Sequence, residues 1–232
     1  MLKIHKNCLI IEPICVLWQL KVNGQKSLRI DKKKFIYLVS PNKISKNSFY
    51  KDLAKVFKSN KISFFQLRLK NEKINKKFLI GKKIQKICKK YSVKFLINDD
   101  PNLAKKLNAD GCHLGQNDMS IGEARKILKD KIIGITCHNS IKLAKIGIFN
   151  KADYIAFGAF YASKTKKIKF KAKINILNSI KKITKTPIVA IGGINSKNYK
   201  KLLLNKANFL AISGYIWNNK KYKPDEAIKK IK

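Results

Sequence analysis

Polar and charged side chains gather at the ends of several apolar segments of this sequence. The stretch ISFFQLRLKN begins as a buried strand, and alternate side chains of an extended chain share a face, so Gln66, Arg68 and Lys70 point to one side. The next two apolar segments lead into the carboxylates Asp99 and Asp118. Carboxylates suit a Mg²⁺ ion that also binds a substrate phosphate, and the cations would surround that ion. These residue types indicate a site for a polyanion about the size of a pyrophosphate.

The charged composition separates a general basic surface from a few informative charges. The chain has 53 Lys and Arg against 13 Asp and Glu, a formal net charge of +40. Such a surface can bind nucleic acid through its phosphates. However, the only arginines are Arg29, Arg68 and Arg125, whereas nucleic-acid surfaces favour bidentate guanidinium contacts. We interpret the excess as a lysine bias on solvated helix faces and expect no dedicated nucleic-acid partner.

Cysteine usage and hydropathy bear on the compartment. Five cysteines, an odd number with no Cys-x-x-Cys pair, are typical of a reducing environment in which thiols are small buried apolar groups. No apolar segment reaches membrane-spanning length. The N-terminus is basic and then apolar, as in a signal peptide, but Glu12 and Pro13 interrupt it. We expect a cytoplasmic location and no membrane partner.

Eight short apolar segments, rich in β-branched and aromatic residues, predict buried parallel strands. They are FIYLVS (35–40), SFFQLRL (63–69), KFLIND (94–99), GCHLG (111–115), IIGITC (132–137), YIAFGAF (154–160), PIVAIGG (187–193) and FLAISG (209–214). Helical spacing separates them, and strand followed by helix about eight times predicts an α/β protein, a single-domain (β/α)8 TIM barrel over residues 35–232. The alternative is an open doubly wound sheet. Even spacing and the lack of one Gly-rich dinucleotide fingerprint favour the barrel.

Residues outside this repeat and several helix starts can also be assigned. Residues 1–34 form an N-terminal extension of unknown role, in which residues 22–25 are suited to a hairpin turn. Ser120 and Glu123 have the spacing of a capping box. Pro101 is suited to the first position of a helix. The segment NSKNYKKLLLNKA places Asn195 or Ser196 at a cap.

The carboxyl ends of barrel strands carry the chemistry in this fold. Besides the residues above, they bear Asn98, Gln116, Thr136, Ser163, Thr165, Lys166, the pair Gly192-Gly193, and Ser213. We expect Mg²⁺ between Asp99 and Asp118. We expect a second anionic group where backbone amides follow the seventh and eighth strands, near Ser213.

Each of these residues also has a structural interpretation. Asp99 could simply cap the helix that follows, and Asp118 could be a loop residue beside the Ser120 cap. Lys166 lies in a lysine-rich loop and could be a solvated charge. His113 could be catalytic or a hydrogen-bonded core residue, and the same holds for His138. The functional interpretation rests on the joint placement of these residues.

The sequence resembles the thiamine phosphate synthase family over about residues 35–217. The matching blocks occur in the expected order. They are QLRLK (66–70), INDD (97–100), ADGCHLGQND (109–118), IGITCHN (133–139), ADYIAFGAF (152–160), SKTK (163–166), PIVAIGG (187–193) and AISGYIW (211–217). The resemblance implies a (β/α)8 fold and an enzyme (EC 2.5.1.3) that condenses hydroxymethylpyrimidine pyrophosphate with hydroxyethylthiazole phosphate, giving thiamine phosphate and pyrophosphate.

The resemblance also implies roles for individual residues. Asp99 and Asp118 would bind Mg²⁺, and Arg68, Lys70 and Lys166 would be catalytic. The pyrimidine pyrophosphate would be bound by Gln66, Leu67, Arg68, Leu69, Lys70, Asn98, Thr136 and Lys166. The thiazole phosphate would be bound by Ser163, Lys164, Thr165, Gly193, Ile212 and Ser213.

The chain departs from the family pattern at a few positions. Thr136 replaces a more frequent Ser and Ser163 a usual Thr, and both changes keep the hydroxyl. Asp100 replaces a frequent Arg and adds a negative charge beside the metal site. Three alternatives stay open: a thiazole tautomerase of similar fold, which needs no pyrophosphate-binding residues; a basic RNA-binding protein; and a non-catalytic family member.

Overall fold

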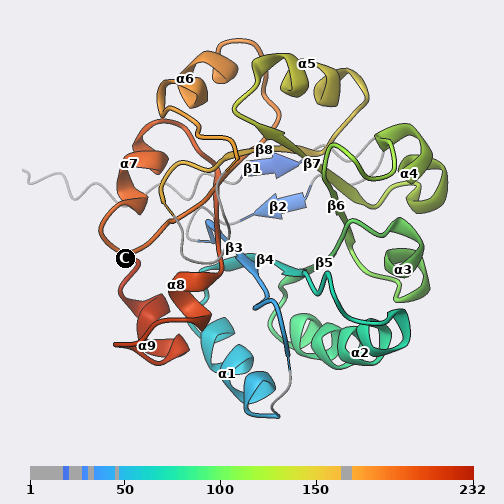
Figure 1. Cartoon of the computed structure of the whole chain (residues 1–232), viewed down its shortest axis with the longest axis vertical. Coiled ribbons are helices and arrows are strands. Elements are labelled where there is room, and N and C mark those ends of the chain that lie inside the picture. The colour runs from blue at the N-terminus through green and yellow to red at the C-terminus, as the bar shows by residue number, and fades with distance from the viewer. Residues whose placement is uncertain (1–17, 21–27, 31–33, 45–46, 163–168) are drawn as a thin grey trace, which may run out of the picture.

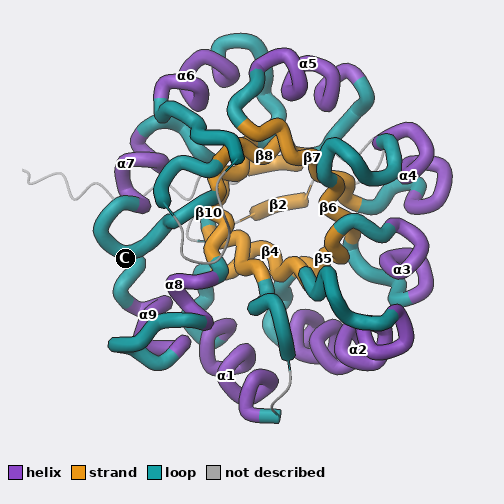
Figure 2. Tube along the Cα trace, in the orientation of Figure 1, coloured by secondary structure: helices purple, strands orange, loops and turns teal. Residues whose placement is uncertain are grey.

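Eight parallel strands close into a barrel in this computed structural model (Figure 1). The structure describes residues 18–20, 28–30, 34–44, 47–162 and 169–232. Strands that are consecutive in the sequence are neighbours in the barrel, and the last pairs in parallel with the first, which closes the ring (Figure 2). The expected (β/α)8 barrel is confirmed, and an open sheet is excluded.

Every apolar segment that we expected to form a strand does so. The strands are β3 (Ile36–Val39), β4 (Ile62–Leu67), β5 (Lys94–Asn98), β6 (Gly111–Leu114), β7 (Ile132–His138), β8 (Tyr154–Gly158), β9 (Ile188–Ile191) and β10 (Phe209–Ile212). Nearly all their residues are buried, because helices cover the outside and side chains fill the inside. Residues such as Ser40, Arg68 and Asp99 lie just beyond these bounds, in loops at the carboxyl end of the barrel.

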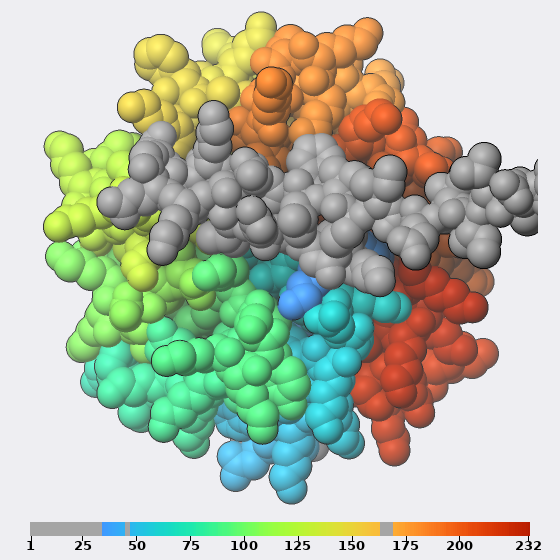
Figure 3. All heavy atoms as spheres, turned by 180° about the vertical axis from the view of Figure 1, so that it is seen from behind, coloured from blue at the N-terminus to red at the C-terminus, as the bar shows by residue number. Residues whose placement is uncertain are grey.

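Helices follow the strands and form a ring outside the barrel. They are α1 (Ser48–Phe57), α2 (Ile74–Lys90), α3 (Pro101–Lys106), α4 (Ile121–Leu128), α5 (Ile141–Phe149), α6 (Asn175–Lys181), α7 (Tyr199–Leu204), α8 (Gly214–Trp217) and α9 (Pro224–Lys229). Seen from behind, the colours follow one another around the molecule from cyan to red (Figure 3). Each helix buries the apolar side that its spacing predicts, as Leu53 and Val56 do on α1.

Capping signals in the sequence determine where two of these helices begin. The hydroxyl of Ser120 accepts the N–H of Glu123 at 3.2 Å, and the Glu123 carboxylate accepts the N–H of Ser120 at 3.0 Å, which confirms the capping box. Pro101 is the first residue of α3, as expected. The residue that caps α3 is Asp100, whose Oδ1 accepts the N–H of Leu103 at 2.9 Å. Asp99 therefore does not cap α3 and is left for another role.

The expected cap at Asn195 forms on the turn that leads into α7, where Asn195 Oδ1 accepts the N–H of Lys197 at 2.8 Å, and not on the helix itself. The helix α7 begins at Tyr199, and Asn198 stands at its cap position without a side-chain cap bond. The side chain of Asn198 instead turns back and accepts the N–H of Asn195 at 2.9 Å. This local bond competes with the helix and delays its start.

The interior of the barrel is packed below its carboxyl end. The inward residues form one apolar cluster that consists of Tyr37, Val39, Phe64, Leu96, Ile132, Tyr154, Ala156, Val189, Phe209 and Ala211. Gly134 on β7 makes room for a ring from the next strand, since a Cβ there would lie 1.9 Å from the ring of Tyr154. The packed interior leaves the carboxyl end as the place where ligands can enter.

Arg125, one of the three arginines, joins elements at the opposite, amino end of the strands. Its Nη2 donates to Asp153 Oδ2 at 2.8 Å, and its Nη1 donates to the carbonyl oxygens of Lys129 and Lys131. Asp153 is 7% exposed, and Oδ2 also accepts the N–H of Ile133 at 2.8 Å. Burial raises the pKa of the Asp153 carboxyl, which the Arg125 and Ile133 bonds oppose. This arginine is structural.

The N-terminal region contributes a separate pair of strands. β1 (Trp18–Leu20) pairs antiparallel with β2 (Leu28–Ile30), and neither strand joins the barrel sheet. The pairing agrees with the expected hairpin, whose turn lies outside the described residues. None of the helices in the described segments is both long and apolar enough to cross a membrane.

Candidate active site

A buried amide and a partly buried one form the base of the site. Gln66, the last but one residue of β4, lies inside the barrel with only 3% of its surface exposed. Its Nε2 donates to Asn98 Oδ1 at 2.6 Å, and the two residues lie on the adjacent strands β4 and β5. The remaining amide donors and acceptors of the two side chains can form hydrogen bonds with a polar heterocycle. The structure thus brings together the first residues expected to bind the pyrimidine.

Two carboxylates and a lysine lie next to this pair of amides. Lys70 Nζ is 3.1 Å from Asp99 Oδ2. The backbone of Asp99 has a φ of 64°, and its N–H donates to the carbonyl oxygen of His113 on β6 at 2.8 Å. Burial raises the pKa of Asp118, and a hydrogen bond between the carboxyl groups of Asp118 and Asp99 raises it further. The two acids therefore face each other, as a shared cation requires.

The loop after β6 holds Asp118 in that position. Asp118 Oδ2 accepts the N–H of Gly115 at 2.7 Å, which closes a tight turn. A Cβ at position 115 would lie 2.8 Å from the same oxygen, so glycine allows the close approach. The structural interpretation of Asp118 is correct in part, because one of its oxygens shapes the loop. The same carboxyl group also interacts with that of Asp99.

The donor set fits a magnesium ion. Within the described ranges no three His, Cys, Asp or Glu side chains come together as a metal cluster. Two facing carboxylates are enough for Mg²⁺, which completes its shell with waters and substrate phosphate oxygens. A cation would also relieve the repulsion that raises the pKa of Asp118. Asp99 and Asp118 are therefore the residues that could hold it.

Arg68 lies where the first barrel loop meets the end of β4. Its backbone N–H donates to the hydroxyl of Ser40 at 2.9 Å, and its Nη1 donates to Asn42 Oδ1 at 3.3 Å. Ser40 is buried at the end of β3, and its carbonyl oxygen accepts the hydroxyl of Ser213 at 3.0 Å. The guanidinium is therefore held near the mouth with other donor groups available.

The glycine pair after β9 is required by its surroundings. Gly192 and Gly193 have φ values of 107° and 61°. A Cβ at Gly193 would lie 2.2 Å from the carbonyl oxygen of Ala162. Ile212, buried, ends the neighbouring strand β10 just before Ser213. The predicted residues Ser163, Lys164, Thr165 and Lys166 lie outside the described residues, directly after Ala162.

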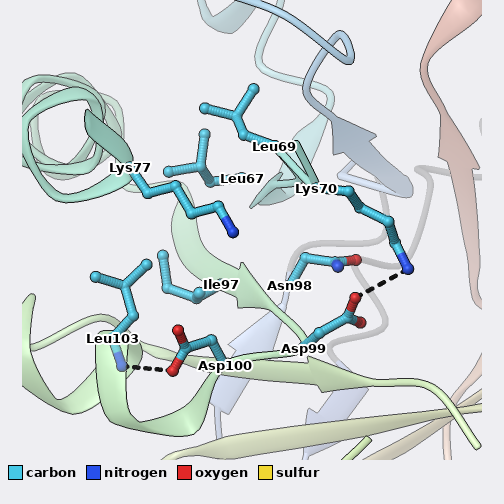
Figure 4. A pocket seen from close by; sticks show the side chains of 9 residues that line it. All are labelled: Leu67, Leu69, Lys70, Lys77, Ile97, Asn98, Asp99, Asp100 and Leu103. Atoms are coloured by element: carbon cyan, nitrogen blue, oxygen red, sulfur yellow. Dashed lines mark hydrogen bonds and ion pairs between the residues drawn. The ribbon is translucent and has the colours of Figure 1, made fainter. Parts of the chain in front are cut away.

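A small cavity of about 170 Å³ lies behind the ends of β4 and β5 (Figure 4). Figure 4 shows the ammonium of Lys77 pointing into it from α2. Its lining consists of Leu67, Leu69, Lys70, Lys77, Ile97, Asn98, Asp99, Asp100 and Leu103. The side chains of Leu67 and Leu69 thus face the helices, and these residues can contribute only their backbone to the mouth.

Thr136 has hydrogen-bond partners on the neighbouring strand β6 and in the loop that follows it, which the sequence pattern does not specify. His113 Nε2 lies 2.8 Å from Thr136 Oγ1, and His113 Nδ1 lies 2.8 Å from the hydroxyl of Tyr154. Desolvation lowers the pKa of His113 to about 4, with a smaller opposing effect of Asp118. The side chain of Gln116 donates to the carbonyl oxygen of Thr136. His113 is thus a hydrogen-bonded core histidine, as one of the two interpretations held.

Another residue at the mouth that sequence reasoning missed is Ile191. It ends β9, two residues after the inward-facing Val189, and is 38% exposed. An exposed aliphatic side chain beside polar groups can pack against the face of a heterocycle. Its signal was present in the period-2 alternation of PIVAIGG, which we used only to place the strand.

Comparisons with known proteins agree with this geometry. Residues 36–216 match the family described as thiamine monophosphate synthase. A protein named thiamine-phosphate synthase from Pelagibacter ubique (strain HTCC1062) is 72% identical over 200 residues, which cover 86% of this chain and 97% of that protein. Another so named, from Rhodospirillum centenum (strain ATCC 51521 / SW), is 35% identical over 185 residues, covering 79% and 89%.

A solved structure shares the fold. Thiamine phosphate pyrophosphorylase from Pyrococcus furiosus superposes with a TM-score of 0.75 at 24% identity, covering 86% of this chain and 94% of that one. The match of 181 consecutive positions, from 36 to 216, and the high identity to the first relative both concern the barrel that carries the site described above. The chain belongs to the thiamine monophosphate synthase family.

Proposed function

We propose that this protein condenses hydroxymethylpyrimidine pyrophosphate with hydroxyethylthiazole phosphate to give thiamine phosphate and pyrophosphate. The observation that carries the proposal is the meeting of Lys70, Asp99 and Asp118 beside the Gln66–Asn98 amide pair. A cationic and metal-binding group next to a polar heterocycle site suits a pyrimidine that carries a diphosphate. Small molecules are the expected partners.

The reaction demands little proton transfer from the protein. The C–O bond between the pyrimidine methylene and the diphosphate breaks, the electron pair leaves with the diphosphate, and the thiazole nitrogen forms the new C–N bond. The aminopyrimidine stabilises the positive charge that develops on the methylene carbon. The enzyme therefore has to neutralise the departing charge and hold the two reactants in line.

Each part of the mouth has a role in this scheme. Gln66 and Asn98 would orient the pyrimidine through their amides. Arg68 and Lys70 would neutralise the diphosphate as it leaves. Asp99 and Asp118 would hold Mg²⁺, which when bound would supply further charge neutralisation on the diphosphate, worth several kcal/mol.

The thiazole phosphate would occupy the other half of the mouth. The backbone amides after β9, at Gly193, and at the start of α8, after Ser213, would bind this phosphate. Ser163, Lys164 and Thr165 would complete this subsite, and Lys166 would reach the diphosphate. Because β10 pairs with β3, and Ser213 and Arg68 both bond to Ser40 at the end of β3, this subsite lies beside Arg68. The two substrates can then meet at the centre of the mouth.

The direct test is product formation. Purified protein is incubated with both substrates and Mg²⁺, and thiamine phosphate and pyrophosphate are measured by chromatography. We expect both products in equal amounts, and no product when the metal is removed by a chelator. Conversion of a thiazole tautomer without the pyrimidine substrate would favour the tautomerase. Strong, salt-dependent RNA retention without turnover would favour the nucleic-acid binder.

A matched pair of variants tests the cations. Arg68→Ala should lower kcat about 100-fold, since the loss of a charged donor to the leaving group costs roughly 2–3 kcal/mol. Lys73→Ala is the control, because Lys73 is an exposed lysine in the loop that follows Lys70, and it makes no cap bond. It removes the same charge and should leave kcat unchanged. Pyrophosphate release at the wild-type rate by Arg68→Ala would contradict the assigned role.

A further inference from the structure

A chain of hydrogen bonds crosses the barrel interior and ends at Thr136. The hydroxyl groups of Tyr37 and Tyr154 are 2.8 Å apart. The hydroxyl of Tyr154 is also 2.8 Å from His113 Nδ1, and His113 Nε2 is 2.8 Å from Thr136 Oγ1. Four strands, β3, β8, β6 and β7, contribute one member each. Thr136 is the member nearest the mouth, because it lies near the carboxyl end of its strand.

A glycine on the intervening strand makes the chain possible. In the barrel, Gly134 of β7 pairs with His113 of β6 on one side and with Tyr154 of β8 on the other. Because Gly134 has no side chain, the two rings meet over it, with centroids 5.6 Å apart and planes 12° apart. A Cβ at this position would lie 1.9 Å from the tyrosine ring. The arrangement is therefore built into three neighbouring strands.

The number of buried donors determines the direction in which the hydrogen bonds of this chain run. Tyr37 and Tyr154 are 2% and 1% exposed, and within the described residues the hydroxyl of Tyr37 bonds only to Tyr154. If the bonds ran from Thr136 toward Tyr37, the hydroxyl hydrogen of Tyr37 would be buried without an acceptor, which is costly. In the opposite direction Tyr37 donates to Tyr154, which donates to His113 Nδ1. The hydroxyl hydrogens of both tyrosines and the ring N–H of His113 then each have an acceptor.

This direction determines what Thr136 offers at the mouth. With Nδ1 as an acceptor, His113 carries its proton on Nε2 and donates it to Thr136 Oγ1. Oγ1 is thereby occupied as an acceptor, and among the described residues the hydroxyl has no other side-chain or backbone partner. Its own hydrogen is free to point into the mouth. The side-chain amide of Gln116 donates to the backbone carbonyl oxygen of Thr136, which fixes the position of that residue.

We propose that His113 is a positioning residue, set by Tyr154 and Tyr37, that makes the Thr136 hydroxyl a hydrogen-bond donor to an acceptor atom of the pyrimidine substrate. The inference rests on the proposed function for the identity of the substrate. It assigns a task to a histidine, two tyrosines and a glycine that do not themselves need to contact the reacting atoms.

The first test reads the tautomer in the wild-type protein without substrate. The protein has 3 histidines, so long-range proton–nitrogen correlation of ¹⁵N-labelled protein gives a simple spectrum. The His113→Asn variant identifies the signal of His113. We expect the Nε2–H tautomer. An Nδ1–H tautomer would reverse the chain and overturn the proposal, whatever reaction the protein catalyses.

The second test is a double-mutant cycle on kcat/KM with both substrates. Thr136→Val, which removes the hydroxyl at nearly constant shape, and His113→Asn should each lower kcat/KM about tenfold, as expected for one hydrogen bond. If His113 acts through Thr136, the double variant is no slower than Thr136→Val alone. Thr136→Ser, which keeps the hydroxyl, should stay within about threefold of wild type.

The outcomes separate the proposal from simpler explanations. Losses that multiply to about 100-fold in the double variant would show that His113 acts independently of Thr136, and they would overturn the proposal. Urea unfolding of each variant shows whether it is folded at the assay temperature. If the wild-type protein makes no thiamine phosphate, the proposed function fails, whereas the tautomer measurement still decides the direction of the chain.

Discussion

Neutralising one of the two facing carboxylates should stabilise the protein and remove its response to magnesium. In Asp118→Asn the amide oxygen can still accept the N–H of Gly115, now 2.7 Å from Asp118 Oδ2, so the turn is kept. The repulsion with Asp99, which contributes to the raised pKa of Asp118, disappears. The function of the site therefore opposes the stability of the metal-free protein.

The magnitude follows from the exposure of the pair. Two like charges about 4 Å apart repel by about 4 kcal/mol at an effective dielectric constant near 20. Lys70, 3.1 Å from Asp99 and 53% exposed, offsets part of this repulsion, and solvent screens exposed charges. We expect a net gain of about 1 kcal/mol in the free energy of unfolding without metal. For a chain of this size that corresponds to a rise in Tm of about 2–4 °C.

The assay is thermal or urea unfolding with and without Mg²⁺. At a Mg²⁺ concentration ten times Kd, the wild-type protein should gain about 1.4 kcal/mol, and Asp118→Asn should gain nothing. The control is Asp100→Asn, which removes the same charge nearby and keeps an acceptor for the N–H of Leu103. It should retain the magnesium response. Lower stability of metal-free Asp118→Asn, or an unchanged response to Mg²⁺, would refute the reasoning.

Three further predictions concern the frame of the site. Gly193→Ala should lower the free energy of unfolding, measured by urea titration, by about 2–4 kcal/mol, because its Cβ would lie 2.2 Å from the carbonyl oxygen of Ala162. Gly122→Ala is the control, because its Cβ would meet nothing within 4 Å and should cost nothing. Asp153→Ala should cost about 3 kcal/mol in the same assay, because it leaves the partly buried guanidinium of Arg125 without its carboxylate and the N–H of Ile133 without an acceptor. A loss below about 1 kcal/mol would contradict this. Hydrogen bonds from Ser120 lower the pKa of Glu123. The stability advantage of wild type over Glu123→Gln should therefore be full at pH 7 and disappear as the pH falls below the ordinary carboxylate range. An advantage that stays constant between pH 7 and 3 would refute this prediction.

Part of the site could be predicted because it depends on local order in the chain. The alternation in ISFFQLRLKN places Gln66 inside the barrel and Leu67 outside it, since successive side chains of a strand face opposite sides. The repeat of strand and helix predicts the barrel, and the barrel brings the loops after β5 and β6 to one end. The meeting of Asp99 and Asp118 follows from those two steps.

Other features depend on contacts that no local pattern specifies. Asp99 and Asp100 are adjacent acids before a helix, and the sequence did not distinguish the cap from the metal-binding candidate. The structure assigns Asp100 to the cap, because its oxygen reaches the N–H of Leu103, and it leaves Asp99, with a φ of 64°, facing the mouth. The late start of α7 is similar, since Asn198 bonds back to Asn195.

By itself, the sequence determined the order and burial of the strands, the capping box at Ser120 and the residue types at the mouth. Only the tertiary structure decided that His113 points to Thr136 and that Tyr37 meets Tyr154, 117 positions away. Periodicity shows which face a side chain occupies, but not which side chain from another strand lies opposite. That choice depends on the register of the closed barrel and on the space left by Gly134, which arise only when all eight strands are paired.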